Sequence, residues 1–152
     1  MRRSNRSSEP DDVGSAALEF IVVGLLLLVP LVYLVVALGA IQTHALGAEA
    51  AARHLARTVS TASDSRDAQQ RADRVLSAVA EEYGMDADEL RVGLSCSPAG
   101  SDCPTAGATL VVTVGTRVAL PLVPPVLGLD RVARIPVEAI AVQKVSRFWG
   151  TQ

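Results

Sequence analysis

The chain has 152 residues and a formal net charge of -2, with 49% hydrophobic, 20% charged and 3% aromatic residues. This length is typical of one domain of ordinary size. The nearly balanced charge excludes a basic nucleic-acid-binding protein and an acidic disordered chain, so we expect no nucleic-acid partner. Two cysteines are too few for a disulfide-dense miniprotein.

A long apolar run without any charged residue extends from Phe20 to Ile41. As a helix that rises ~1.5 Å per residue, it would be roughly 33 Å long, which is enough to cross a bilayer. The rest of the sequence has an ordinary soluble composition. The sequence therefore predicts a single-pass membrane protein with a short N-terminal tail and a larger C-terminal part.

The positions of the arginines indicate the orientation of this span. Arg2, Arg3 and Arg6 precede the run, whereas Arg53 and Arg57 follow it within about twenty residues. The excess of Arg before the run predicts a cytoplasmic N-terminus, and export signals also begin with such a tail. We therefore expect the chain in the cytoplasmic membrane, with its C-terminal part outside.

Three fates of this N-terminus are open. A signal peptidase would cut near Ala37-Leu38-Gly39 and release a soluble module. However, the run exceeds the ~7–15 residues of the apolar region of a signal peptide and contains Pro30. A second possibility is an uncut anchor that carries a small extracytoplasmic binding domain. The third is processing ahead of the apolar run.

The segment before the run reads Gly14-Ser15-Ala16-Ala17-Leu18-Glu19-Phe20. The simple interpretation of Glu19 is an interfacial carboxylate that the helix dipole favours. A sharper interpretation uses the spacing, because cleavage after Gly14 would create an amine on Ser15, one helical turn from Glu19. The amine of a neighbouring helix, shifted by about one turn, would then pair with this carboxylate and set the register between subunits.

Gly14, Glu19 and Phe20, followed by the long apolar helix, resemble the processing site of type IV prepilins. The Glu–Phe pair is similar to that of the Flp/Tad branch in particular. With its length, its Ala-rich sequence after the run and its C-terminal strand region, the chain resembles the TadE-like minor pilins, or pseudopilins, of the actinobacterial type. Pro30 lies farther from the Glu than the Pro of many members of that family.

The resemblance implies that a prepilin peptidase cuts between Gly14 and Ser15 on the cytoplasmic side and removes residues 1–14 as a leader. Glu19 would become the fifth mature residue and help to recruit the subunit. The product would act in assembling an Flp-type (Tad) pilus or secretion apparatus. Its partners would be the membrane, other pilin or pseudopilin subunits and Tad assembly proteins, and it would stay in the membrane or join the cell-surface pilus.

The helical pattern continues beyond the membrane, because apolar residues recur at helical spacing as far as Ser60. We expect one transmembrane and stalk helix over residues 15–60. Small residues repeat along it at every fourth position: Gly39, Thr43, Gly47 and Ala51. Such a ridge allows close helix approach and would be a packing seam between subunits, although Ala- and Gly-rich sequences also form such ridges by accident.

Residues 61–152 are predicted to form an extracytoplasmic α+β domain that begins with an amphipathic helix. Ser65 is a suitable N-cap for this helix, and Gly84 is a suitable residue for its end. The helix should fold back on strands that follow it in the sequence.

From Leu90 the apolar period changes to two, which predicts strands. The second strand covers residues 110–120, with Gly115 as a candidate bulge. The third covers Ile135–Val145, with Pro136 near its start or on an edge. We expect three antiparallel strands covered by one helix, in a small aliphatic domain.

Cys96 and Cys103 bracket a polar loop between the first two strands. Outside the cytoplasm a disulfide is the natural pairing, with free thiols as the alternative, and the spacing matches neither a CxxC redox motif nor a zinc site. His44 and His54 are not spaced as a metal pair on a helix, and no phosphate loop or nucleophile elbow is present. We therefore expect a structural assembly protein rather than an enzyme, with no catalytic residue, cofactor or metal.

Overall fold

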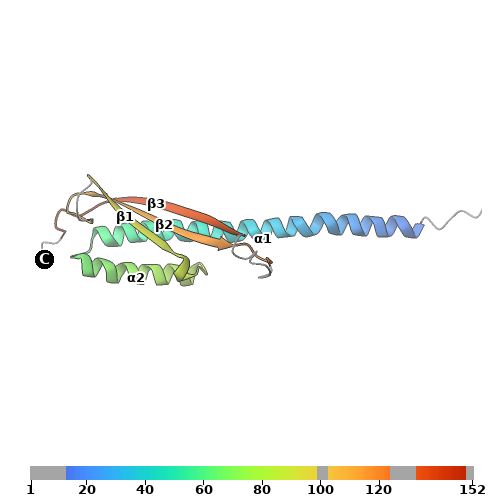
Figure 1. The fold of residues 1–152 in the computed structure, drawn as a ribbon, viewed down its shortest axis with the longest axis horizontal. Coiled ribbons are helices and arrows are strands. Elements are labelled where there is room, and N and C mark those ends of the chain that lie inside the picture. Colours follow the sequence, from blue (N-terminus) through green and yellow to red (C-terminus); the bar gives the residue numbers. More distant parts are fainter. Residues whose placement is uncertain (1–12, 99–102, 124–132, 150–152) are drawn as a thin grey trace, which may run out of the picture. The chain divides into compact units, whose positions relative to one another are not determined.

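The structure, a computed structural model, describes residues 13–98, 103–123 and 133–149 (Figure 1). The chain divides into two units, of which the first ends at Val36 and the second begins at Ala37. The elements are the helices α1 (Val13–Ser60), α2 (Ser65–Glu82) and the short 3-10 helix η1 (Ala87–Glu89), and the strands β1 (Arg91–Ser97), β2 (Thr109–Ala119) and β3 (Arg134–Lys144). The predicted α+β class, with a long N-terminal helix, a second helix and three antiparallel strands, is confirmed.

The first unit contains most of the apolar part of α1. Its large apolar side chains are exposed, from 79% at Phe20 to 47% at Val36. Pro30 lies inside the helix, where it supplies no backbone N–H for the helical hydrogen bonds. The helix nevertheless continues past it to Ser60, the end that the sequence predicts.

In the second unit, one face of α1 forms the centre of the core. This face consists of small residues around one larger side chain, all fully buried: Ala48, Ala51, Ala52 and Leu55. They belong to one cluster with three inward side chains of β2, namely Leu110, Val112 and Val114. Because Ala side chains are short, the backbone of α1 can lie close to the sheet.

The domain is therefore built on two helices rather than the one expected. The second half of α1 is part of the domain instead of a free stalk, because its Ala face is needed to cover the sheet. The second compact unit accordingly begins at Ala37, within α1. Figure 1 shows α2 lying beside this half of α1, and its Ala68 and Val79 are buried in the same core.

The first turn of α2 is capped by two carboxylates. Asp64, and not the predicted Ser65, is the N-cap, since its side chain accepts a hydrogen bond from the Asp67 N–H at 2.8 Å. Asp67 in turn accepts from the backbone N–H of Ser63 at 3.0 Å and from the Arg71 side chain at 2.6 Å. The Ser63 bond first, and then the Arg71 bond, lower the pKa of Asp67 from its ordinary value of 3.8. The bond from the Asp67 N–H pairs one of the backbone groups that a helix start leaves unsatisfied.

The end of α2 follows the prediction at Gly84. This residue has a φ of 61°, in the left-handed region that favours glycine. The N–H of Met85 donates to the carbonyl of Ala80 at 2.8 Å, which is the Schellman arrangement for ending a helix.

The sheet has the order β1-β2-β3 with antiparallel neighbours. The predicted bulge at Gly115 is wrong, because this residue pairs one-to-one with Arg91 on β1 and with Glu138 on β3. An extra residue there would reverse the side-chain alternation, whereas residues on both sides of Gly115 keep the same face buried. Pro136 lies on β3, which is an edge strand, as predicted.

Candidate membrane and assembly interface

The predicted processing segment lies at the beginning of α1. Gly14 and Ser15 belong to this helix, whereas residues 1–12 of the predicted leader lie outside the described residues. Glu19 is exposed, and so is Phe20 after it. One turn of helix separates Glu19 from the backbone of Ser15. The geometry therefore places the carboxylate where a second chain can reach it.

The apolar surface that follows Glu19 is continuous. No Asp, Glu, Lys or Arg occurs between Glu19 and Glu49, and the large aliphatic side chains over 20–36 are exposed. Soluble monomers rarely expose apolar patches above a few hundred Å². The helix is long and apolar enough to cross a membrane by length and composition.

The ridge of small residues is divided by the fold. Gly47 and Ala51 are buried, and a Cβ atom at Gly47 would lie 2.9 Å from both the Tyr83 Cγ and the Met85 Cε. Gly39 and Thr43 are exposed, and the Thr43 hydroxyl donates to the Gly39 carbonyl at 3.0 Å. Gly47 and Ala51 thus contribute to packing within the chain. A contact of Gly39 and Thr43 with another subunit stays a prediction.

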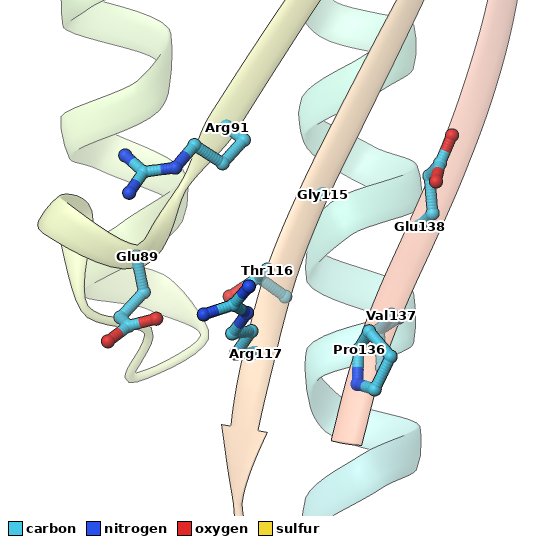
Figure 2. Close-up of a pocket in the computed structure, with 8 residues that line it drawn as sticks. All are labelled: Glu89, Arg91, Gly115, Thr116, Arg117, Pro136, Val137 and Glu138. Atoms are coloured by element: carbon cyan, nitrogen blue, oxygen red, sulfur yellow. The ribbon is translucent and has the colours of Figure 1, made fainter. Parts of the chain in front are cut away.

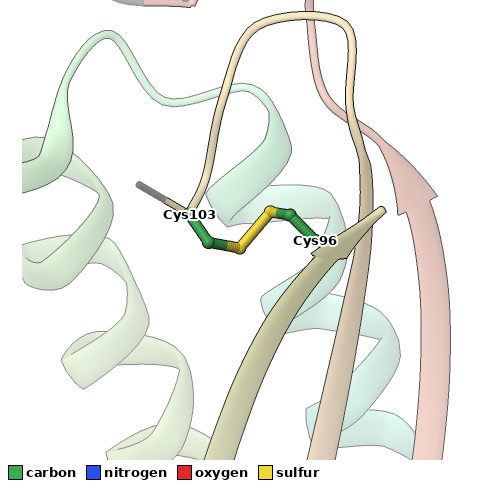
Figure 3. Close-up of a disulfide and its surroundings, with 2 residues drawn as sticks. All are labelled: Cys96 and Cys103. Atoms are coloured by element: carbon green, nitrogen blue, oxygen red, sulfur yellow. A yellow bond between two sulfur atoms is a disulfide. The ribbon is translucent and has the colours of Figure 1, made fainter. Parts of the chain in front are cut away.

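A disulfide joins Cys96 and Cys103, with the two Cα atoms 5.7 Å apart (Figure 3). Cys96 lies opposite Leu110 in the register, on the face of the sheet that the helices cover. Both cysteines are partly buried against the core. The bond therefore ties the loop between β1 and β2 to the domain, while residues 99–102 within that loop lie outside the described part of the chain.

The outer face of the sheet, turned away from the helices, carries charged side chains around a shallow depression (Figure 2). Arg91 lies opposite Gly115, and Arg117 follows two residues later on β2, so both side chains emerge on this face. Glu89 lies beside them and forms an ion pair with Arg134.

The sequence alone does not reveal this cluster, because only the strand register brings Arg91 and Arg117 together. The signal in the sequence was that Arg91 lies on the polar side of the alternating pattern in the first predicted strand. The cluster contains both signs of charge. It is suited to contact with a polar or charged surface.

Within residues 13–98, 103–123 and 133–149, no three His, Cys, Asp or Glu side chains are grouped so that they could hold a metal ion. Comparison with known proteins gives no relative, since no protein-family model, curated protein or solved structure matches the chain.

Proposed function

We propose that this chain is a TadE-like minor pilin or pseudopilin, which α1 anchors in the cytoplasmic membrane and which acts in assembling an Flp-type (Tad) pilus or secretion apparatus. In this role it is a structural subunit and not an enzyme. The observation that carries the proposal is the combination of Gly14, Glu19 and Phe20 with the apolar part of α1, whose large aliphatic side chains over 20–36 are exposed. Such a surface is satisfied only by lipid or by neighbouring helices.

The disulfide supports the orientation of the proposed subunit. Disulfides persist on the oxidising side of a membrane and are rare in the cytosol. The bond between Cys96 and Cys103 therefore favours a domain outside the cytoplasm. The N-terminal tail with its three arginines then lies inside, where a prepilin peptidase acts on the Gly14–Ser15 bond.

Glu19 has a defined role in this proposal. A carboxylate inside a membrane costs roughly 2.5–3.5 kcal/mol at mid-helix on insertion scales, and less at the membrane edge where Glu19 lies, unless it has a partner. Cleavage supplies such a partner, because an α-amine with a pKa of about 7.7–8.0 is largely positive at neutral pH. Pairing of the Ser15 amine of one subunit with Glu19 of the next removes the cost only in the correct register.

The experiment compares Glu19→Ala with Glu49→Ala in the native host. Glu49 is a matched control because it is an exposed carboxylate on the same helix, where it forms an ion pair with Arg53. We expect the Glu19 variant to enter the membrane and yet be missing from the assembly, and the Glu49 variant to be incorporated normally. Normal incorporation of Glu19→Ala would contradict the register role.

The N-terminus of the mature protein separates this proposal from its alternatives. Intact mass and terminal sequencing of the protein from native membranes should give a start at Ser15. A start at Met1 would favour an uncut anchor with a small binding domain. A start near Ala40 would identify a secreted module and would remove Glu19 from the mature chain.

A further inference from the structure

The buried face of α1 continues into the apolar run. Going back along the helix from Ala48, the positions His44 and Ile41 are partly buried, and Ala37 is only 8% exposed. These positions are three or four residues apart and share one side of the helix. Ala37 and Ile41 both belong to the second unit as well as to the apolar run. The domain therefore packs against the last residues of the apolar run, from Ala37 to Ile41.

Two backbone hydrogen bonds fix the level of the sheet along this part of α1. The N–H of Ser146 donates to the carbonyl of Ser60 at 3.1 Å, and the N–H of Val145 donates to the carbonyl of Ala108 at 2.8 Å. The beginning of β2 thus lies level with the C-terminal end of α1. From there β2 runs back along the helix (Figure 1).

The length of β2 carries its far end to the apolar run. From Ala108 to Leu120 an extended chain covers about 40 Å. From Ser60 back to Ile41, α1 covers about 29 Å. Leu120 is still held in the ladder, since its N–H donates to the Ala133 carbonyl at 3.2 Å. The turn after β2 therefore reaches the level at which the apolar run ends.

The residues of this turn suit a boundary between lipid and water. Leu122 is 83% exposed and has a φ of 63°, a conformation that is uncommon for residues other than glycine. The fold thus holds a large apolar side chain outside the core. Arg117, five residues earlier in the sequence and on β2, is also exposed. An exposed apolar side chain with a cation close by is typical of segments that lie in a membrane interface.

We propose that the turn Leu120–Leu122, together with Arg117, rests on the outer leaflet of the membrane that α1 crosses. Leu122 enters the boundary of the acyl chains, and the Arg117 guanidinium binds lipid phosphates. This inference rests on the proposed anchoring by α1 and adds a second contact with the same membrane. The contact keeps the domain at the membrane surface, and the subunit must release it when it leaves the bilayer.

Depth-dependent fluorescence quenching tests the contact in the full chain. Trp149 is the single Trp, so Trp149→Phe provides a background in which one new Trp reports its own position. L122W probes the turn, and I140W is the matched control, because Ile140 is an aliphatic residue, 62% exposed, on the outer face of the sheet. L28W reports on the apolar part of α1.

Each variant is reconstituted in phosphatidylethanolamine–phosphatidylglycerol vesicles with doxyl groups either near the headgroups or deep in the acyl chains. We expect the shallow quencher to lower L122W emission by about twofold and to leave I140W nearly unchanged, because interfacial segments sit about 5–10 Å into the boundary. L28W should respond to the deep quencher. If L122W alters the circular dichroism spectrum, V123W takes its place with the same expectation.

The outcomes separate this inference from the proposed anchoring. Quenching of L28W without quenching at the turn overturns the contact and leaves the anchor in place. Equal quenching of L122W and I140W also overturns it, because the contact would then not be specific to this end of the sheet. Absence of quenching in L28W overturns the anchor and the contact together.

Discussion

Gly47 is the position at which α1 leaves room for the end of α2. A Cβ atom there would lie 2.9 Å from the Tyr83 Cγ and 2.9 Å from the Met85 Cε, whereas ordinary contact begins at 3.4 Å. The Met85 side chain is flexible and can move away. The Tyr83 ring cannot do so as easily, because its Cγ atom is one bond from Cβ. Gly47→Ala therefore forces the end of α2 to shift.

Two opposing effects set the magnitude for Gly47→Ala. Alanine favours a helix over glycine by about 1 kcal/mol, whereas overpacking a core costs typically about 1–3 kcal/mol. We expect a net loss of about 1 kcal/mol in the free energy of unfolding. Gly39→Ala is the matched control on the same helix, because a Cβ atom at Gly39 meets nothing within 4 Å. This control should be neutral or stabilising.

The assay is denaturant unfolding of the full chain in detergent micelles, followed by the fluorescence of Trp149. This single Trp is partly buried against the core and reports on the second unit. A lower midpoint for Gly47→Ala than for Gly39→Ala is the expected result. If both variants unfold at the same midpoint, the close contact of Gly47 with Tyr83 and Met85 is wrong.

Two further predictions concern the loop and the helix cap of the domain. Replacing both Cys96 and Cys103 by Ala should lower the free energy of unfolding by about 2.5 kcal/mol, because the unfolded loop is then no longer constrained. Reduction of the disulfide in the native chain should give the same loss in the same assay. An unchanged unfolding midpoint would contradict this stabilising role of the disulfide. The lowered pKa of Asp67 means that its contribution is present above the ordinary value of 3.8 and is lost as the pH falls below it. Asp67→Asn should therefore lower the unfolding midpoint near neutral pH and make the midpoint fall less steeply as the pH is lowered. The control Asp73→Asn should leave the fall of the midpoint in acid unchanged. Equal pH profiles for the two variants would refute the capping role.

The elements that the sequence predicts well are those set by local rules. The end of α1 at Ser60 follows from a helical pattern that meets a polar break, and the end of α2 at Gly84 follows from the need for a positive φ. Pro136 lies on an edge strand because a central strand needs its N–H. The disulfide follows from two cysteines that flank a short loop.

Features that depend on tertiary packing were not predictable in the same way. Ser65 and Asp64 are both suitable N-caps, and only the hydrogen bond to Asp67 decides between them. The cluster with Arg91 and Arg117 depends on strand register, which an alternating pattern restricts to one face but does not align. The level of the turn Leu120–Leu122 along α1 depends on the length of β2 relative to that of α1, and neither element reveals this level alone.

The geometry of a helix explains why the ridge of small residues is divided. Residues four apart advance by about 40° around the axis, so the ridge winds by about 120° between Gly39 and Ala51. Ala51 lies on the core face, Gly47 at its margin, and Gly39 on the side of exposed Leu46. A straight partner helix cannot follow this ridge without displacing the sheet. We therefore expect contacts between subunits along this part of α1 to involve Gly39, Thr43 and Leu46, and not the whole ridge.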